Sequence, residues 1–313
     1  MPKPIRPIHP IGLIGLGLMG SAIAERLIAT GFTVIGWDIS PEARAAFKKL
    51  GGTCAANSSE VFAHCDSILL SLPNSKITAA VLRVVAPAIT PHHIIADTST
   101  GDPQDAVLFD KKLSPSGATY LDATISGNSD QVRRAEVLVM VGGTKYAFGH
   151  CKKLFDTFAA RTIHTGYVGS ASRMKLVTNL VLGLNRAALA EGLVFARALK
   201  LDDKQALEIL RASMAYSRIM DVKGEKMLSG DFKPQARLSQ HLKDVRLMLA
   251  AAAKAQTKLP LSQTHKKILS AAESAGLGDL DNSAIIQIIG GSRPKPICPI
   301  SPISPIGRIH SSK

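Results

Sequence analysis

The first half of the chain alternates short apolar runs with segments of helical periodicity. The apolar runs have three to six residues, as buried strands do, and lie at 12–14, 32–37, 67–72, 94–97, 118–121, 137–141 and 162–164. The segments between them have apolar residues at three- and four-residue steps, notably at 41–50, 76–86, 103–113 and 146–158. Helix-start residues precede three of these segments, at Ser40-Pro41, Asn74-Ser75 and Asp102-Pro103. This alternation predicts a parallel sheet covered by helices on both faces.

Past Gly166 the pattern becomes purely helical. A single pattern without proline runs from 170 to 199, and others follow at 203–215, 218–228, 235–257, 260–275 and 283–289. The sequence therefore predicts an α/β protein with two domains. A Rossmann-type, doubly wound, mostly parallel sheet forms a first domain at 11–165. An all-α domain at 166–290 follows, opened by a long interdomain helix.

The two ends of the chain differ from its body in their proline content. Residues 1–10 repeat proline at short intervals, and residues 291–313 contain Pro-Ile units at a period of three. Proline at this density favours extended polyproline II and prevents helices and central strands. We expect both ends to be disordered tails, with a role as a ligand of SH3-type domains as the alternative.

A glycine-rich turn follows the first apolar run and precedes a helical segment. It reads Gly15-Leu16-Gly17-Leu18-Met19-Gly20, and Asp38 ends the second apolar run 18 residues later. This order is typical of a dinucleotide-binding unit, in which the pyrophosphate lies on the helix N-terminus. The carboxylate of Asp38 would accept hydrogen bonds from the adenosine ribose and repel a 2′-phosphate, so we predict NAD rather than NADP. Arg44, the nearest cation, is expected on the solvated face of the next helix.

Further polar and small residues follow the later strands or open the long helix. Leu72-Pro73, Thr100, Ser126-Gly127-Asn128 and the pair Lys175-x-x-x-Asn179 are the segments in question. Together with the glycine turn they resemble the β-hydroxyacid dehydrogenase family, which includes 3-hydroxyisobutyrate and 6-phosphogluconate dehydrogenases. The resemblance covers about residues 11 to 290 in the order and spacing of that family. His241-Leu242-Lys243-Asp244 also resembles the family's Lys-Asp motif.

The resemblance implies hydride transfer between NAD and a small β-hydroxy acid similar to 3-hydroxyisobutyrate. The expected roles of the two domains are therefore NAD binding for 11–165, and substrate binding and oligomerisation for the all-α domain at 166–290. It implies Lys175 as the general acid/base, Asn179 as a substrate-orienting residue, and Ser126 and Gly127 as donors to the substrate carboxylate. Further implied roles are cofactor contacts for Leu72, Pro73 and Thr100, and a place for Lys243 near the cofactor and the substrate carboxylate. Asp244 is expected to fix local structure.

The helical spacing of Lys175 and Asn179 supports their assignment independently. Residues four apart project from one face of a helix and can address one substrate. A lysine amine has an ordinary pKa of about 10.4, so it acts as a base near neutral pH only when burial or a nearby cation lowers that value.

Two residues depart from the family pattern. Asn128 stands where the family usually has a second glycine, and its amide would narrow the substrate pocket and add donors. Asparagine can adopt the left-handed backbone that glycine would take. Ala171 replaces the third glycine before the lysine, which affects the start of the long helix. A semialdehyde or imine reductase of the same family and a non-catalytic dehydrogenase-like scaffold remain as alternative functions.

Composition sets the remaining expectations. The net charge is +14 over 313 residues, and six of the positive charges lie in the two ends, leaving about +8 on the body. Without a zinc-finger spacing or an RNA-binding aromatic signature, specific nucleic-acid binding is not expected. The four cysteines show no metal-like spacing, no metal is predicted, and no apolar run reaches the ~18 residues of a membrane span. We expect a cytoplasmic homodimer or homotetramer that acts on a small hydroxy acid.

Overall fold

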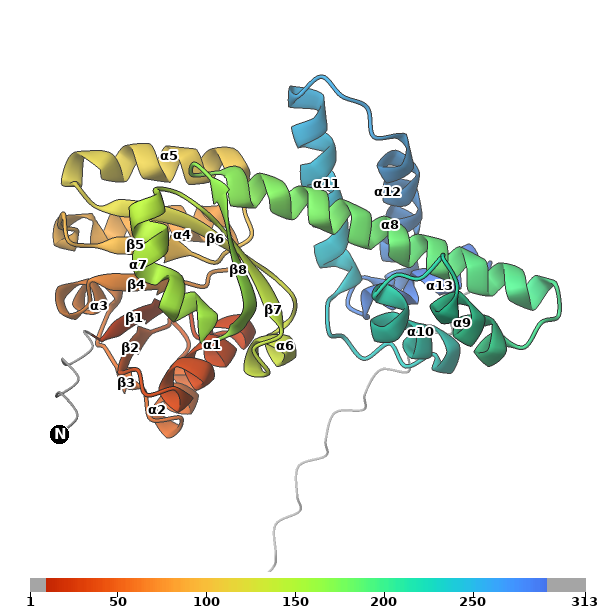
Figure 1. The fold of residues 1–313 in the computed structure, drawn as a ribbon, viewed down its shortest axis with the longest axis horizontal. Helices are drawn as coiled ribbons and strands as arrows, with labels where there is room; N and C mark the ends of the chain where they lie inside the picture. Colours follow the sequence, from red (N-terminus) through yellow and green to blue (C-terminus); the bar gives the residue numbers. More distant parts are fainter. Residues whose placement is uncertain (1–9, 292–313) are drawn as a thin grey trace, which may run out of the picture. The chain divides into compact units, whose positions relative to one another are not determined.

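The computed structural model describes residues 10–291 (Figure 1). The predicted proline-rich tails lie, apart from Pro10 and Gly291, outside the described residues. An eight-stranded sheet has the order β3-β2-β1-β4-β5-β6-β7-β8, and only β6 and β7 pair antiparallel. The strands are β1 (Ile11–Ile14), β2 (Val34–Trp37), β3 (Thr53–Cys54), β4 (Ser67–Leu70), β5 (Ile94–Asp97), β6 (Thr119–Ser126), β7 (Val137–Gly142) and β8 (Ala159–Gly166). The predicted doubly wound, mostly parallel sheet is confirmed.

Helices connect these strands, and further helices joined by loops follow the last strand. The α-helices of the sheet region are α1 (Leu18–Ala29), α2 (Pro41–Lys49), α3 (Ser58–His64), α4 (Ser75–Val85), α5 (Pro103–Leu113), α6 (Ser129–Arg133) and α7 (Lys145–Asp156). The later α-helices are α8 (Ser170–Ala198), α9 (Asp203–Ala212), α10 (Ile219–Ser229), α11 (Leu238–Lys254), α12 (Pro260–Ala272) and α13 (Ile285–Ile289). Short helical turns are η1 (Ala86–Ala88), η2 (Ser114–Ser116), the π-helical η3 (Glu273–Leu277) and η4 (Asn282–Ala284).

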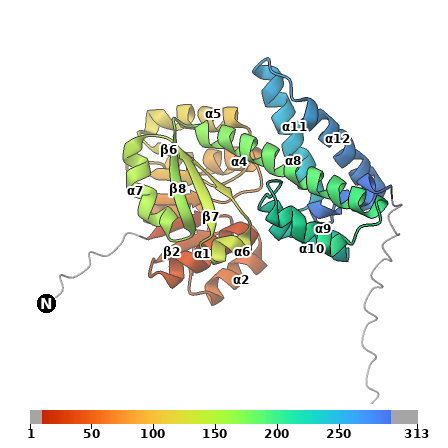
Figure 2. The same cartoon turned by 45° about the vertical axis from the view of Figure 1, so that its right-hand side comes forward.

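Alternating strand residues build a separate core on each face of the sheet. Within β4, Leu69 belongs to the core beneath α1, α6 and α7, whereas Ile68 and Leu70 belong to the core beneath α3, α4 and α5. Successive strand side chains point to opposite faces, so one apolar run supplies both cores. On the first face α6 packs beside α1 (Figure 2).

The predicted helix starts are confirmed by their caps. Ser40 Oγ accepts a hydrogen bond from Ala43 N, Asn74 Oδ1 from Ile77 N, and Asp102 Oδ1 from Gln104 N. Each cap satisfies one of the N–H groups that a helix start leaves without an intrahelical partner. The sequence did not predict β3, α3 and α6, which have only two, seven and five residues.

Strand β6 is longer than the sequence predicted. The apolar run ends at Leu121, but the strand continues to Ser126 because Asp122–Ser126 pair antiparallel with Leu138–Gly142 of β7. This extension carries β6 directly into the Ser126-Gly127-Asn128 segment.

The contacts divide the chain into two compact units. The first contains the described residues up to Asn185 and the segment Gln240–Lys266, and the second contains Arg186–Ser239 and the described residues from Lys267 on. Helices α8, α11 and α12 thus each contribute residues to both units. Every site residue that the sequence predicted belongs to the first unit.

Helix α8 is long and apolar enough, by length and composition alone, to cross a membrane. Its most apolar window is 39% buried inside the protein, and the helix also buries the charged residues Lys175 and Arg186. Core helices of soluble proteins meet the same criteria, and the first turns of α8 pack against β6 of the sheet.

Candidate active site

Two glycines of the glycine-rich turn are required by packing. Gly15 has φ +94°, and a Cβ on it would lie 2.2 Å from Ser71 O. A Cβ on Gly20 would lie 1.9 Å from Gly15 O, which a side chain cannot do. These positions let the turn close tightly and let α1 approach β1, as a dinucleotide-binding turn requires.

The third glycine, Gly17, leaves open space. No heavy atom lies within 4 Å of the position that its Cβ would take, so packing does not explain the absence of a side chain. Gly17 is also the N-cap of α1, where no side chain caps the helix and no acidic residue lies in the first turn. Uncapped N–H groups and the positive end of the helix dipole therefore border this space, which fits a pyrophosphate.

Asp38 lies at the carboxyl end of β2, beside the glycine turn. Its Oδ2 accepts a hydrogen bond from Leu16 N at 2.6 Å, and its Oδ1 accepts one from Ser40 N at 2.8 Å. A carboxylate has about four acceptor positions, so it can accept further hydrogen bonds from ribose hydroxyls. Asp38 thus fits the ribose role that the sequence predicted for it.

Arg44 differs from its expected place on the solvated face of α2. Its side chain is half-buried and reaches back, so that Nη1 donates to Asp38 O at 2.5 Å and to Ile39 O at 3.1 Å. A cation therefore stands at the end of β2, against the backbone of Asp38.

The predicted cofactor-lining residues lie at the ends of β4 and β5. Leu72 N donates to Ser99 Oγ at 2.9 Å, which joins the loops that follow these two strands, and Thr100 comes next in the chain. A Cβ on Gly15 would lie 3.2 Å from Leu72 Cδ2, so Leu72 also borders the glycine turn. Pro73 is exposed beside it. The structure thus brings Leu72 together with the turn that the pyrophosphate would occupy.

Lys175 is buried against the end of β6, directly before the Ser126-Gly127-Asn128 segment. The side chain is 9% exposed, and its Nζ donates a hydrogen bond of 2.6 Å to Ile125 O, the residue directly before Ser126. Burial lowers the pKa of the Lys175 amine to about 8, while the carboxylate of Asp244 acts in the opposite direction. The amine can therefore both accept and release a proton near neutral pH.

Asn179 and the Lys-Asp motif meet beside Lys175. Asn179 Nδ2 donates to Asp244 Oδ2 at 3.2 Å, and Gln240 Nε2 donates to Asp244 Oδ1 at 3.3 Å. Burial raises the pKa of Asp244, and the charges of Lys175 and Lys243 oppose this shift. Asp244 was expected only to fix local structure, but it is also the carboxylate whose charge acts on the Lys175 amine. Lys243 is half-buried next to it.

A glycine in α8 lets α11 approach. A Cβ on Gly183 would lie 2.4 Å from His241 Nε2 and 2.9 Å from His265 Cε1. The two buried imidazole rings have centroids 5.2 Å apart. Gly183 lies one helical turn after Asn179, so it sets the distance at which α11 presents Asp244. A glycine inside a helical pattern was the signal that could have predicted this contact.

The Ser126-Gly127-Asn128 segment has a different backbone geometry at Asn128 than the sequence suggested. Gly127 has φ +149°, but Asn128 has an extended backbone (φ −114°) and caps α6. Asn128 Oδ1 accepts from Gln131 N at 2.9 Å, and Asn128 N donates to Gln131 Oε1 at 3.0 Å. This reciprocal arrangement is a capping box. It uses the backbone N–H of Asn128 and the oxygen of its side chain, which leaves the Nδ2 group of Asn128 as its further donor.

The comparison with protein families matches both parts of the chain. Residues 10–169 match the NAD-binding domain of 6-phosphogluconate dehydrogenase, and residues 169–289 match the NAD-binding region of NADP-dependent 3-hydroxyisobutyrate dehydrogenase. The two matches meet at the start of α8.

Individual proteins agree with this result. The chain is 32% identical over 282 residues to 2-(hydroxymethyl)glutarate dehydrogenase of Eubacterium barkeri, covering 89% of this chain and 94% of that protein. It is 29% identical over 285 residues to L-threonate dehydrogenase of Cupriavidus necator, covering 90% and 96%. A solved structure of 3-hydroxyisobutyrate dehydrogenase from Mycobacterium tuberculosis with L-serine has a TM-score of 0.83 and 26% identity, covering 90% of this chain and 98% of that one.

These matches extend over nearly all of the described chain. The chain therefore belongs to the β-hydroxyacid dehydrogenase family of NAD(P)-dependent oxidoreductases.

Proposed function

We propose that this protein transfers a hydride between NAD and a small β-hydroxy acid similar to 3-hydroxyisobutyrate, with Lys175 as the general acid/base. The observation that carries the proposal is the buried Lys175 amine, which lies 2.6 Å from the carbonyl oxygen directly before the Ser126-Gly127 segment. An amine that is buried at this place and has a pKa of about 8 is suited to exchange a proton with a substrate hydroxyl.

In the oxidation, the substrate loses a proton from its hydroxyl group and a hydride from the carbon that bears it. Lys175 in its neutral form takes the proton at Nζ, and the product is an aldehyde or keto acid. The bound nicotinamide supplies the hydride acceptor. In the reduction, the protonated amine returns its proton to the forming alkoxide.

The substrate carboxylate and hydroxyl need fixed donors. We assign Ser126 Oγ and Gly127 N to the carboxylate, with Asn128 Nδ2 as a further donor since the other polar groups of Asn128 are used in the capping box. Asn179 shares the face of α8 with Lys175 and is itself held by Asp244, so it can orient the substrate. Lys243 adds positive charge near the same carboxylate.

NAD is proposed over NADP. The Asp38 carboxylate lies where the 2′-hydroxyl would bind, and a 2′-phosphate placed there would be repelled. Arg44 opposes this preference, because its guanidinium donates a hydrogen bond to the backbone oxygen of Asp38 and places a positive charge beside the carboxylate. The choice therefore depends on which of these two charges faces the cofactor.

The proposal includes a cytoplasmic location and assembly as a homodimer or homotetramer, without a membrane or a nucleic acid. The free thiols of Cys54, Cys65 and Cys151 are consistent with a reducing compartment. Exposed apolar side chains of the helical region, such as Phe195 and Ile209, are consistent with self-association. Light scattering on the protein as it elutes from a size-exclusion column measures its molar mass and therefore the number of subunits.

An assay in two steps tests the proposed activity. NADH fluorescence with the pure protein measures cofactor binding, and the reduction of NAD and of NADP is then followed across a panel of β-hydroxy acids. We expect binding of NADH and turnover of at least one hydroxy acid, faster with NAD. Binding of NADH without turnover of any of these acids would instead favour the non-catalytic scaffold.

A further inference from the structure

Helix α8, which carries Lys175, begins without a cap of its own. The residue before it, Gly169, has φ +89°, and a Cβ on it would lie 2.9 Å from Val107 Cγ2 and 3.1 Å from Pro103 O. Both the backbone conformation and the space require glycine at this position. The N-cap residue therefore has no side chain to accept a hydrogen bond from the first N–H groups of a helix of 29 residues.

Asp122 of β6 supplies the missing cap from a distance of 47 residues along the chain. Its Oδ1 accepts from Gly169 N at 3.0 Å, and its Oδ2 accepts from Ser172 N at 2.8 Å. Ser172 is the third helical residue, whose N–H an N-cap side chain commonly satisfies. Asp122 is only 2% exposed, so water does not compete for these bonds.

The neighbouring strand makes room for this carboxylate. Gly142 of β7 pairs with Asp122, and a Cβ on Gly142 would lie 2.2 Å from Asp122 Oδ1 and 2.7 Å from Ser170 Oγ. Any side chain at Gly142 would therefore displace either the carboxylate or the start of α8.

The same strand also holds the Lys175 amine. Thr124 Oγ1 donates to Ala171 O at 3.3 Å, and Ile125 O accepts from Lys175 Nζ at 2.6 Å. Asp122, Thr124 and Ile125 thus fix the first two turns of α8 along β6, immediately before the strand reaches Ser126. A shift of the helix start would move Lys175 relative to the substrate loop.

We propose that Asp122 is a positioning residue for the reaction, because its cap on α8 holds the Lys175 amine in its buried place against the Ile125 carbonyl. This inference rests on the proposed role of Lys175. Both carboxylate oxygens of Asp122 accept hydrogen bonds from the start of α8, so we assign its effect to the helix and not to a contact with the substrate.

Other ionisable groups lie near both residues. Asp122 lines a small polar cavity with Asp97 and Tyr120, and Tyr120 donates to Asp97 Oδ2 at 2.8 Å. Burial raises the pKa of Asp122, while the N–H groups of Ser172 and Gly169 oppose that shift. The carboxylate of Asp244 on α11 is the charge that acts on Lys175.

The variant Asp122→Asn tests the proposal because it keeps the size of the side chain and removes one of two acceptor oxygens. We expect kcat to fall by about 10²-fold, as misplacement of a reacting group by about 1 Å can cause, with the Kd for NADH unchanged. The pKa of Lys175, measured from the pH–rate profile, should rise from about 8 toward the ordinary lysine value of about 10.4, because the loosened amine gains contact with water. Amide hydrogen exchange should accelerate at residues 169–175.

Asp281→Asn is the matched control. Asp281 is also fully buried and also accepts hydrogen bonds from backbone N–H groups, but it belongs to the second unit. We expect this control to lose stability without a change in the kinetic ionisation. Should Asp122→Asn not fold, Asp122→Ser is measured in the same way, because its smaller side chain leaves space for water.

The outcomes separate the inference from the function on which it rests. If Lys175→Ala has the same pH–rate profile as the wild type, no ionisation in that profile belongs to Lys175, and its proposed role is contradicted. If the wild-type profile has that ionisation and folded Asp122→Asn keeps both its position and kcat, Asp122 is only structural and the inference is wrong. The same conclusion follows if Asp281→Asn shifts the ionisation equally.

Discussion

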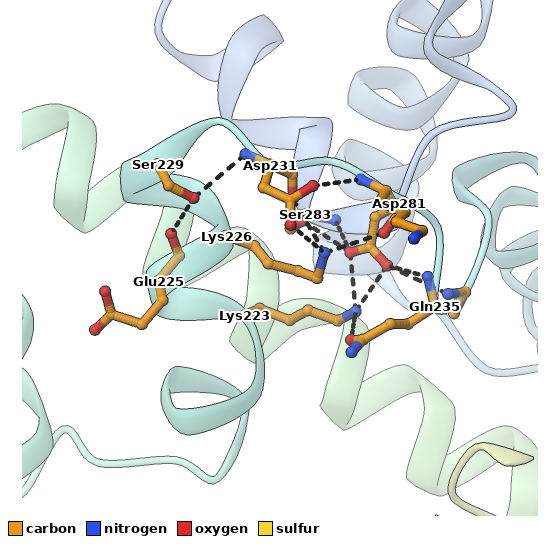
Figure 3. Close-up of polar contacts among 10 residues, drawn as sticks. Lys223, Glu225, Lys226, Ser229, Asp231, Gln235, Asp281 and Ser283 are labelled. Atoms are coloured by element: carbon orange, nitrogen blue, oxygen red, sulfur yellow. Dashed lines mark hydrogen bonds and ion pairs between the residues drawn. The ribbon is translucent and has the colours of Figure 1, made fainter. Parts of the chain in front are cut away.

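The two compact units each bury a lysine, and the two lysines have opposite surroundings. In the first unit the Lys175 amine donates to the neutral carbonyl of Ile125, and the described contacts give it no ion pair. In the second unit Lys223 Nζ lies 2.8 Å from both oxygens of Asp281 and 3.1 Å from Gln235 Oε1 (Figure 3). The comparison is therefore between a buried amine that contacts a neutral carbonyl and a buried amine that contacts a carboxylate.

The partner of Lys223 is fixed by several further donors. Asp281 also accepts from Gln235 N, Ala236 N, Ser283 N and Ser283 Oγ, at 2.7 to 3.2 Å. Burial alone would raise the pKa of Asp281, but the Lys223 ion pair and these donors lower it to about 2. This carboxylate therefore stays ionised. Burial lowers the pKa of Lys223 as well, but the hydrogen bonds and the charge of Asp281 oppose that shift. Lys175 has no such partner in contact, so burial can favour its neutral form.

Removal of the Lys175 amine should have the largest effect. We expect Lys175→Ala to lower turnover by about 10²–10⁴-fold, the range for a lost acid/base group. The affinity for NADH should remain nearly unchanged, because the glycine turn and Asp38 are intact. Steady-state kinetics and NADH fluorescence measure the two quantities, and a variant with wild-type kcat would show that Lys175 is not the acid/base group.

Removal of the Lys223 amine should affect stability instead. Lys223→Met leaves Asp281 as a buried charge without its counter-ion, which typically costs about 3–5 kcal/mol of unfolding free energy. Denaturant unfolding measures this loss, and kcat per folded molecule should not change.

Lys175→Met is the matched control for that comparison. It removes an equally buried amine, but one whose contact partner is a neutral carbonyl, so no charge loses a partner in direct contact. We expect a loss clearly smaller than that of Lys223→Met. Equal losses would mean that the two lysines are held in the same way, which would contradict the comparison.

The two units should also respond to pH in different ranges. Lys175 must be neutral to accept a proton, so the oxidation rate should rise with pH to about 8 and then level off, changing about tenfold per unit below that value. The reduction, which needs the protonated amine, should decline above about 8. A pH–rate profile in both directions measures this, and Lys175→Ala should flatten it.

In the second unit the response appears in stability. The folded pKa of Asp281 is about 2, below the unfolded value of about 3.9, so its contribution is complete above about 3.9 and is lost as pH falls toward 2. Lys223→Met should raise that pKa and move the acid loss upward. Thermal unfolding between pH 2 and 6 measures the shift.

The sequence predicted those parts of the site that local patterns determine. The glycine turn, the caps at Ser40, Asn74 and Asp102, and the shared helix face of Lys175 and Asn179 depend on residues close together in the chain. The capping box of Asn128 was missed, although Asn128 and Gln131 have its characteristic spacing.

The remaining features join residues that are far apart in the sequence. Asp122 caps α8 across 47 residues, and Lys223 meets Asp281 across 58. Neither pairing leaves a periodic signal. Strand β6 was predicted too short because its second half pairs with an antiparallel strand, where Asp122 and Thr124 interrupt the apolar run.

The smallest predicted effect concerns Asp38, beside the glycine turn of the first unit, and the choice between NAD and NADP, in which neither lysine takes part. Asp38→Asn removes a half-buried negative charge while its remaining oxygen can still accept from the glycine turn. We expect the preference of kcat/KM for NAD over NADP to fall by about fivefold, since one such charge is worth on the order of 1 kcal/mol. Parallel assays with the two cofactors measure the ratio.

Arg44 decides how that result is understood. Its guanidinium already lies on the Asp38 carbonyl, so the loss of the carboxylate leaves a cation available to a 2′-phosphate. The double variant Asp38→Asn, Arg44→Ala should therefore have a lower activity with NADP than the single variant Asp38→Asn. The midpoint of its pH–rate profile and its unfolding free energy should match those of the single variant. If the single variant kept the wild-type preference, the ribose assignment of Asp38 would be wrong. If the double variant had the same activity with NADP as the single variant, repulsion by Asp38 alone would explain the selectivity and Arg44 would have no part in it.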